Sequence, residues 1–233
     1  MPPRAAGVAR LYCVSRGNIV VNVFDSDKNV VQYEAWFEKH PAAFESEVFA
    51  LKQILPAGTG FEIGIGTGLF AEKLGIRMGN DPSEAMLAPA RARGRLVYHC
   101  TGDTLPFHDG YFDFVLMVTT ICFLDNPELV LHECNRVVKR TGDIVIGFID
   151  SQSPLGMSYR KRASESLFYR DAHFYSVEQV MTMLTDAGFS VTGVRQTLFG
   201  ELSDITEIQQ SRHGWGKGAF VAVRATKNDS EGR

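Results

Sequence analysis

Apolar residues along this chain recur at two alternating spacings, and the alternation predicts an α/β fold. Segments with apolar residues three or four positions apart, as on one face of a helix, occur at 41–55, 127–139 and 176–187. Short apolar runs suited to buried strands lie at 61–63, 76–80, 96–99, 112–118, 143–149, 189–199 and 219–225. Strands that alternate with helices form a mainly parallel sheet covered on both faces, so we expect a Rossmann-like three-layer sandwich.

The first apolar run leads directly into a glycine-rich turn, Phe61-Glu62-Ile63-Gly64-Ile65-Gly66-Thr67-Gly68. Glycine accepts positive φ without steric strain and lets a ligand approach the backbone closely. With a helix expected next, the turn predicts a cradle for a nucleotide-like ligand; a glycine-rich turn without a ligand is the alternative. A dinucleotide fingerprint would need glycine where Leu69 stands, and the Gly-Lys-Ser/Thr ending of a P-loop does not occur.

Two acids follow the next two strands, at the edge of the sheet where open parallel sheets bind their ligands. Asp81 ends the second strand, where its carboxylate either accepts hydrogen bonds from both hydroxyls of a ribose or caps the helix that follows. Asp103 follows the third strand and either accepts a hydrogen bond from an adenine amino group or serves as a turn residue.

Five segments extend this pattern along the chain in a fixed order. They are FEIGIGTG, GNDPSEAML, GDTLPFHDGYFDFVLMV, ELVLHECNRVVKRTGDIVIGFID and HFYSVEQVMTMLTDAGF. From about residue 31 to 225 the chain resembles the small-molecule class I S-adenosylmethionine-dependent methyltransferases, most closely their quinone-biosynthesis-like subgroup. The resemblance implies a seven-stranded, mostly parallel sheet whose last strand is antiparallel. The chain departs from the family at 139–142, where relatives often have Lys-Pro-Gly-Gly, and at 119–123, where many have histidines.

The resemblance also implies which residues bind S-adenosylmethionine. By motif position they are Glu62, Gly64, Gly66, Gly68, Asp81, Met86, Asp103, Thr104 and Thr119. Glu62 and the glycines would hold the methionine part, Asp81 the ribose with Met86 nearby, and Asp103 with Thr104 the adenine. Thr119 would face the sulfonium and the acceptor.

An aromatic segment, Tyr33 to Phe37, precedes the core. In related enzymes this region closes over the cofactor, which would bring Tyr33 to the methionine carboxylate; the alternative is that the aromatic residues only anchor a helix on the sheet. Thr119 and Tyr33 are therefore positioning candidates, and we assign no general base. The reaction expected is an in-line displacement at the sulfonium methyl that yields S-adenosylhomocysteine.

Composition and charge limit the classes of partner that we expect for this chain. The net charge of −3 offers no basic surface for nucleic acid, so we expect a small-molecule methyl acceptor. No apolar run approaches the roughly 18–20 residues that span a bilayer, and the first seventeen residues lack the apolar core of a signal peptide, so we expect a cytoplasmic protein. The four cysteines form no C-x-x-C pair, which argues against a zinc site. The oligomeric state stays open.

For the domain organisation we expect an N-terminal arm over residues 1–30, a methyltransferase domain over 31–226 with a helical lid at about 31–56, and a polar tail over 227–233. The glycine-rich stretch 200–218 is expected to be a lid or binding loop. Two other functions remain possible for such a chain: an NAD-dependent Rossmann oxidoreductase, against which Leu69 counts, and a cofactor-binding protein of this fold without turnover.

Overall fold

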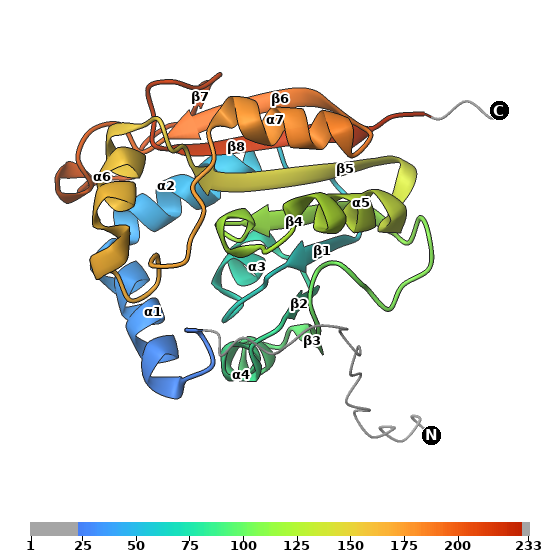
Figure 1. Ribbon diagram of the computed structural model, residues 1–233, viewed down its shortest axis with the longest axis horizontal. Coiled ribbons are helices and arrows are strands. Elements are labelled where there is room, and N and C mark those ends of the chain that lie inside the picture. Colours follow the sequence, from blue (N-terminus) through green and yellow to red (C-terminus); the bar gives the residue numbers. More distant parts are fainter. Residues whose placement is uncertain (1–22, 230–233) are drawn as a thin grey trace.

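Strands from the whole length of the chain form one sheet in the computed structural model, which describes residues 23–229 (Figure 1). The strands in this part are β1 (Gly60–Ile63), β2 (Met78–Asp81), β3 (Leu96–His99), β4 (Phe112–Val118), β5 (Val138–Ile149), β6 (Phe189–Thr197), β7 (Arg212–His213) and β8 (Phe220–Lys227). Their order across the sheet is β3-β2-β1-β4-β5-β8-β6-β7. The first five pair in parallel, and β8 runs antiparallel to β5 and β6. The predicted fold class and the antiparallel last strand are confirmed.

The predicted count of seven strands is too low by one. The additional strand, β7, pairs antiparallel with β6 inside the stretch that we expected to be a loop. The buried side chain of Gln196 holds the segment that leads from β7 to β8. Its Oε1 accepts hydrogen bonds from the backbone N–H groups of Lys217 (2.8 Å) and Gly218 (2.7 Å). β7 itself consists of two exposed residues paired with β6, and two such residues show no apolar period, so the sequence pattern did not predict this strand.

Helices cover both faces of the sheet. They are α1 (Asp27–Lys39), α2 (Pro41–Lys52), α3 (Leu69–Leu74), α4 (Glu84–Ala92), α5 (Pro127–Val137), α6 (Pro154–Arg162) and α7 (Val177–Asp186), with short 3₁₀ turns η1 (Ile121–Phe123), η2 (Ala163–Glu165) and η3 (Leu202–Asp204). In Figure 1, α5 and α7 lie on the near face and α2 and α3 behind the sheet. Alternate residues of β4 join these two cores: Val115 and Met117 pack with α5 and α7, and Phe114 and Leu116 with α2 and α3.

Three predicted boundaries differ from the structure. The first helix begins at Asp27, inside the expected arm, with that acid in its first turn. The strand expected over 143–149 begins earlier, at Val138, and the pairing of this β5 with β4 is irregular between Phe112 and Phe114. The expected tail begins inside β8, where Lys227 Nζ donates a hydrogen bond to the backbone oxygen of Asn135 at 2.6 Å. The remainder of both predicted end segments, residues 1–22 and 230–233, lies outside the described residues.

Between residues 23 and 229, no helix combines the length and the apolar character that crossing a bilayer requires.

Candidate active site

The glycine turn joins β1 to α3 and is shaped by left-handed backbone. Gly64, Gly66 and Gly68 have φ of 67°, 54° and 82°. A Cβ at Gly64 would lie 2.4 Å from Thr120 Cγ2, and one at Gly66 would lie 3.2 Å from Met86 Cε. A side chain at Gly64 is therefore excluded both by the backbone conformation and by its neighbour. Met86 lies beside the turn, as the sequence predicted.

Asp81 lies at the end of β2 and binds the turn directly. Its Oδ2 accepts a hydrogen bond from the Gly66 backbone N–H (3.0 Å) and its Oδ1 one from the Ser83 N–H (2.8 Å). Burial raises the pKa of Asp81 to about 6, although both hydrogen bonds favour the ionised form. The N-cap of α4 is Ser83, whose Oγ accepts from the Met86 N–H, so the alternative that Asp81 itself caps this helix is wrong. Each Asp81 oxygen keeps a lone pair for a further donor.

Glu62 brings a second buried carboxyl to the same turn. It is 2% exposed, and burial raises its pKa well above the ordinary value, against a hydrogen bond from the backbone of Ala71. Its Oε2 has no hydrogen-bond partner among the described residues. A buried oxygen without a partner beside a backbone free of side chains suits a bound ligand that carries a donor, such as an amino group.

The loop after β3 holds Asp103 and Thr104, both exposed. Asp103 Oδ1 accepts a hydrogen bond from Thr101 Oγ1, as in the turn-residue alternative. No contact described for either residue reaches the glycine turn, so the structure places these two candidates on the neighbouring strand end but does not bring them together with the others.

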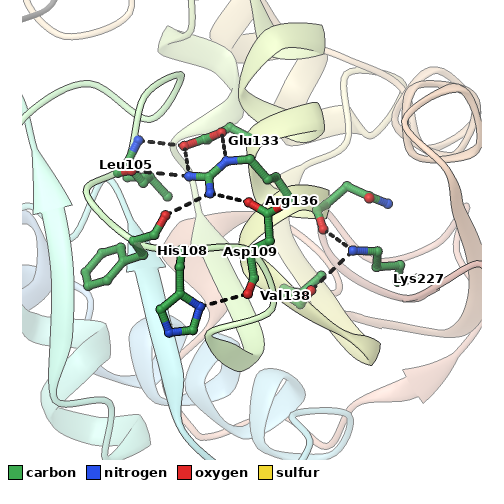
Figure 2. A network of polar contacts seen from close by, with 9 residues as sticks. Leu105, His108, Asp109, Glu133, Arg136, Val138 and Lys227 are labelled. Carbon is green, nitrogen blue, oxygen red and sulfur yellow. Dashed lines mark hydrogen bonds and ion pairs between the residues drawn. The ribbon is translucent and has the colours of Figure 1, made fainter.

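A side-chain network from α5 fixes the rest of this loop (Figure 2). The Arg136 guanidinium donates to the backbone oxygens of Phe107 (2.8 Å) and Leu105 (3.2 Å), while Glu133 Oε1 accepts from the Leu105 N–H (2.6 Å). Arg136 also forms ion pairs with Glu133 and Asp109. Sequence reasoning missed this network, for which the only local sign was an acid and an arginine three positions apart on one helix.

The end of β4 faces the turn through Thr120 rather than Thr119. Thr119 has φ of 50°, rare for a residue with a side chain, and its N–H donates to the Gly147 oxygen at 2.7 Å. Thr120 Oγ1 lies 3.0 Å from the Val118 oxygen and 3.3 Å from the Gly64 oxygen. The predicted residue is thus adjacent to the site, and its neighbour, which we did not predict, makes the contact.

Helix α1 lies against the glycine turn through Tyr33. The Tyr33 hydroxyl lies 3.8 Å from the position of a Cβ on Gly66, and burial together with the charges of Glu62 and Asp81 raises the pKa of this tyrosine. Arg93, the C-cap of α4, connects the same parts: its Nη1 lies 2.8 Å from Glu34 Oε1 and donates to the Thr67 oxygen at 2.9 Å. The structure therefore brings Tyr33 to the glycines, Glu62 and Asp81.

Between residues 23 and 229, no three His, Cys, Asp or Glu side chains are grouped so that they could hold a metal ion.

Comparisons with known proteins agree with this geometry. Residues 61–146 match the family described as methyltransferase domain. An uncharacterized protein of Methanocaldococcus jannaschii is 41% identical over 207 residues, which is 89% of this chain and 100% of the relative. A Thermotoga maritima structure described as a S-adenosylmethionine-dependent methyltransferase, possible histamine N-methyltransferase, has 45% identity and a TM-score of 0.85, covering 88% of this chain and 98% of the other.

A more distant structure shares the fold. Phosphoethanolamine N-methyltransferase 2 of Haemonchus contortus, in complex with phosphomonomethylethanolamine and S-adenosylhomocysteine, is 19% identical with a TM-score of 0.64, over 90% of this chain and 61% of the other. None of these matches singles out the quinone-biosynthesis-like subgroup. The identity over nearly the whole chain, the matched domain and the glycine turn with its two buried acids lead to one conclusion: the chain belongs to the class I S-adenosylmethionine-dependent methyltransferases.

Proposed function

We propose that this protein transfers the methyl group of S-adenosylmethionine to a small organic acceptor and releases S-adenosylhomocysteine. The observation that carries the proposal is the glycine turn between the carboxylates of Asp81 and Glu62. The donor supplies a methyl group already activated by its sulfonium charge. The protein then has to hold the acceptor in line with that methyl group and keep water away.

The site residues divide by the part of the cofactor that each would bind. The proposed set is Glu62, Gly64, Gly66 and Gly68 for the methionine part, Asp81 with Met86 for the ribose, Asp103 and Thr104 for the adenine, and Thr119 beside the methyl group. The two free lone pairs of Asp81 suit a pair of ribose hydroxyls, and the partnerless Glu62 oxygen suits the amino group.

The helical segment α1–α2 is the proposed lid. Tyr33 would reach the methionine end of the cofactor, because its hydroxyl lies beside Gly66. Phe37 continues the cover, with its ring 5.1 Å from that of Tyr33 and 5.0 Å from that of Phe44 on α2. Rings packed in this way exclude water from the turn.

A small acceptor is favoured by two observations. The chain is acidic overall, which disfavours nucleic acid, and the similar Thermotoga protein is described as a possible enzyme for histamine, a small amine. The cytoplasmic location expected from the sequence stays a prediction.

Thermal unfolding with S-adenosylhomocysteine and with NAD separates the proposal from the oxidoreductase alternative. We expect the first ligand to raise Tm and the second to leave it unchanged, since only a bound ligand stabilises the folded state. Stabilisation by NAD alone would contradict the proposal. Stabilisation by S-adenosylhomocysteine without methyl transfer to any member of a broad acceptor panel would favour a binding protein without turnover.

A further inference from the structure

A surface hollow of about 480 Å³ lies on strands β6 and β8, beside the end of α2. Its polar lining comes from four segments: Gln53 after α2, Thr192 and Arg195 on β6, His213 on β7, and Arg224 and Thr226 on β8. Three of these side chains are basic, and no Asp or Glu is among the described residues that line the space. We call it the Arg195 hollow.

The Arg195 hollow lies apart from the glycine turn. Strands β4 and β5 separate β8 from β1, which at about 4.8 Å per strand puts β8 roughly 14 Å from the strand that leads into the turn. Helix α2 gives a second measure. Its first turn adjoins the proposed lid, where Phe44 contacts Phe37 of α1, and its 12 residues then run about 18 Å to the hollow. A ligand in the hollow would therefore not occupy the cofactor site.

Arg195 is a lining side chain whose charge the fold leaves without a partner. Its Nε is buried and has no hydrogen-bond partner among the described residues, and no ion pair within residues 23–229 includes its guanidinium. A buried N–H donor on a permanently charged group costs folding free energy when no acceptor reaches it. An anion bound in the hollow would supply that acceptor.

The neighbouring Arg224, by contrast, is satisfied within the fold. Its Nε and Nη2 donate to the two carboxylate oxygens of Asp143, at 3.1 Å and 2.8 Å, and its Nη1 reaches the Ile54 oxygen at 3.5 Å. Thr226 Oγ1 also donates to Asp143, at 2.7 Å. Asp143 is thus neutralised by Arg224, and the charge of Arg195 stays uncompensated.

Two further polar side chains line the same space as Arg195. His213 is paired directly with Arg195 across the β6–β7 ladder, so both side chains lie on one face of the sheet. Thr192 stands at the irregularity between Val191 and Gly193, and its hydroxyl makes only long contacts, 3.4 Å to the Arg224 oxygen and 3.5 Å to Thr226 Oγ1. An imidazole and a hydroxyl are therefore placed to donate to a ligand that Arg195 holds.

We propose that the Arg195 hollow binds the phosphate group of a small phosphate ester. The guanidinium presents a planar fork of N–H donors that matches phosphate oxygens, and the donors of Thr192 and His213 come from other segments. Three terminal oxygens suit donors from several directions, whereas a carboxylate has only two oxygens in one plane. A volume of about 480 Å³ is within the range of sites for small molecules, so the rest of the ester fits as well. Binding there does not depend on the proposed methyl transfer.

Calorimetry of the full chain at constant ionic strength tests the site with phenyl phosphate, beside benzoate and phenol as probes with the same ring and no phosphate. We expect phenyl phosphate to bind and to raise Tm, and the other two probes to bind at least about tenfold more weakly. Inorganic phosphate should compete with phenyl phosphate for the site. S-adenosylhomocysteine should not compete, because the hollow lies apart from the glycine turn.

Arg195→Met removes the guanidinium and keeps an apolar stem, so it should weaken phenyl phosphate binding by about tenfold or more. Arg212→Met is the matched control. It removes the same charge from the neighbouring strand β7, but the Arg212 guanidinium lies over the Phe199 ring and does not line the hollow. The control should bind phenyl phosphate as the wild type does.

A second variant tests the space rather than the charge. A Cβ at Gly193 would meet Arg224 Cβ and Ile54 Cγ2 only at 3.9 Å, an ordinary contact, so β6 accepts a side chain there. Gly193→Val fills part of the hollow, leaves the net charge unchanged and suits a strand. It should abolish binding of phenyl phosphate even if Arg195→Met fails to fold.

Three results would overturn the proposal: no binding of phenyl phosphate to the wild type, benzoate bound as tightly as phenyl phosphate, or equal losses of affinity in Arg195→Met and Arg212→Met. Binding to vesicles that contain phosphatidic acid, without binding of phenyl phosphate, would also contradict it, because the partner would then be a membrane surface and not a small ester.

Discussion

The glycine turn and helix α2 treat their buried acids in opposite ways. At the turn, the Asp81 carboxylate receives backbone N–H donors that the β–turn–α geometry supplies. On α2, Glu47 is 3% exposed, and burial raises its pKa to about 8 with no hydrogen bond or positive charge acting the other way. The backbone thus offsets part of the cost of burying Asp81, and no such donor offsets that cost at Glu47.

The first way to break the comparison is to put a side chain into the glycine turn. Gly64→Ala adds a Cβ at left-handed φ and 2.4 Å from Thr120 Cγ2. We expect affinity for S-adenosylhomocysteine to fall on the order of 100-fold, roughly 3 kcal/mol, measured by calorimetry.

Two further variants separate the causes of that loss. Gly75→Ala has a similar φ of 73° but open space around it, so it should lose only the stability that the backbone strain costs. Thr120→Ala combined with Gly64→Ala removes the clashing atoms and should restore part of the affinity. No restoration would mean that the close contact with Thr120 is not the cause.

The second prediction concerns the acid that ties β2 to the turn. Asp81→Ala removes the acceptor of two N–H groups and of the proposed ribose hydroxyls, so cofactor binding should weaken by about 1–3 kcal/mol. Asp204→Ala, at an exposed position on η3, is the control and should change nothing. Unchanged affinity of the Asp81 variant by calorimetry would refute the ribose assignment.

The burial of Glu47 should be visible in the pH dependence of stability. The folded-state pKa of Glu47 is about 8, above its ordinary value of 4.5. Its contribution to stability is therefore fully present below about pH 4.5 and is lost as pH rises through 8, by up to about 1.4 kcal/mol per pH unit.

Glu47→Gln should remove that loss. Urea unfolding at pH 5, 6.5 and 8 should show a smaller decline in the free energy of unfolding than in the wild type. Asp81 and Glu62, whose pKa values are also raised, contribute in the same direction to both proteins and cancel in the difference. Tyr33, Tyr159 and Tyr169 stay neutral in this range because burial raises their pKa values. Parallel curves would show that Glu47 does not titrate as described.

The smallest effect is expected from the network that holds the loop after β3. Arg136→Met removes the donors to the Leu105 and Phe107 oxygens and leaves Glu133 without its cation. Affinity for S-adenosylhomocysteine should drop about threefold to tenfold, near 1 kcal/mol, through a loosened loop. Arg140→Met is the control, since Arg140 is 78% exposed in its side chain and pairs only loosely with Asp229 at 3.3 Å. Equal affinities of the two variants would show that the loop needs no such anchor.

The difference between local spacing and contacts of distant segments explains what could be predicted from the sequence. Gly64, Gly66, Gly68 and Asp81 lie at fixed distances along one β–α–β unit, so spacing alone brought them together, and the alternation of apolar runs predicted the sheet. Arg136, Thr120, Glu47 and the strand β7 depend on contacts between segments far apart in the chain, and no local period marks such contacts. The helix cap was a closer miss, because the choice between Asp81 and Ser83, two positions apart, depends on backbone angles.

Arg93 ties the helical cover to the glycine turn. It pairs with Glu34 of α1 and donates to the Thr67 oxygen of the turn, while Tyr33 of the same helix lies beside Gly66. A movement of α1 away from Gly66 would have to break the Arg93–Glu34 ion pair and carry Tyr33 with it. The ion pair and the tyrosine would then act as one latch over the turn.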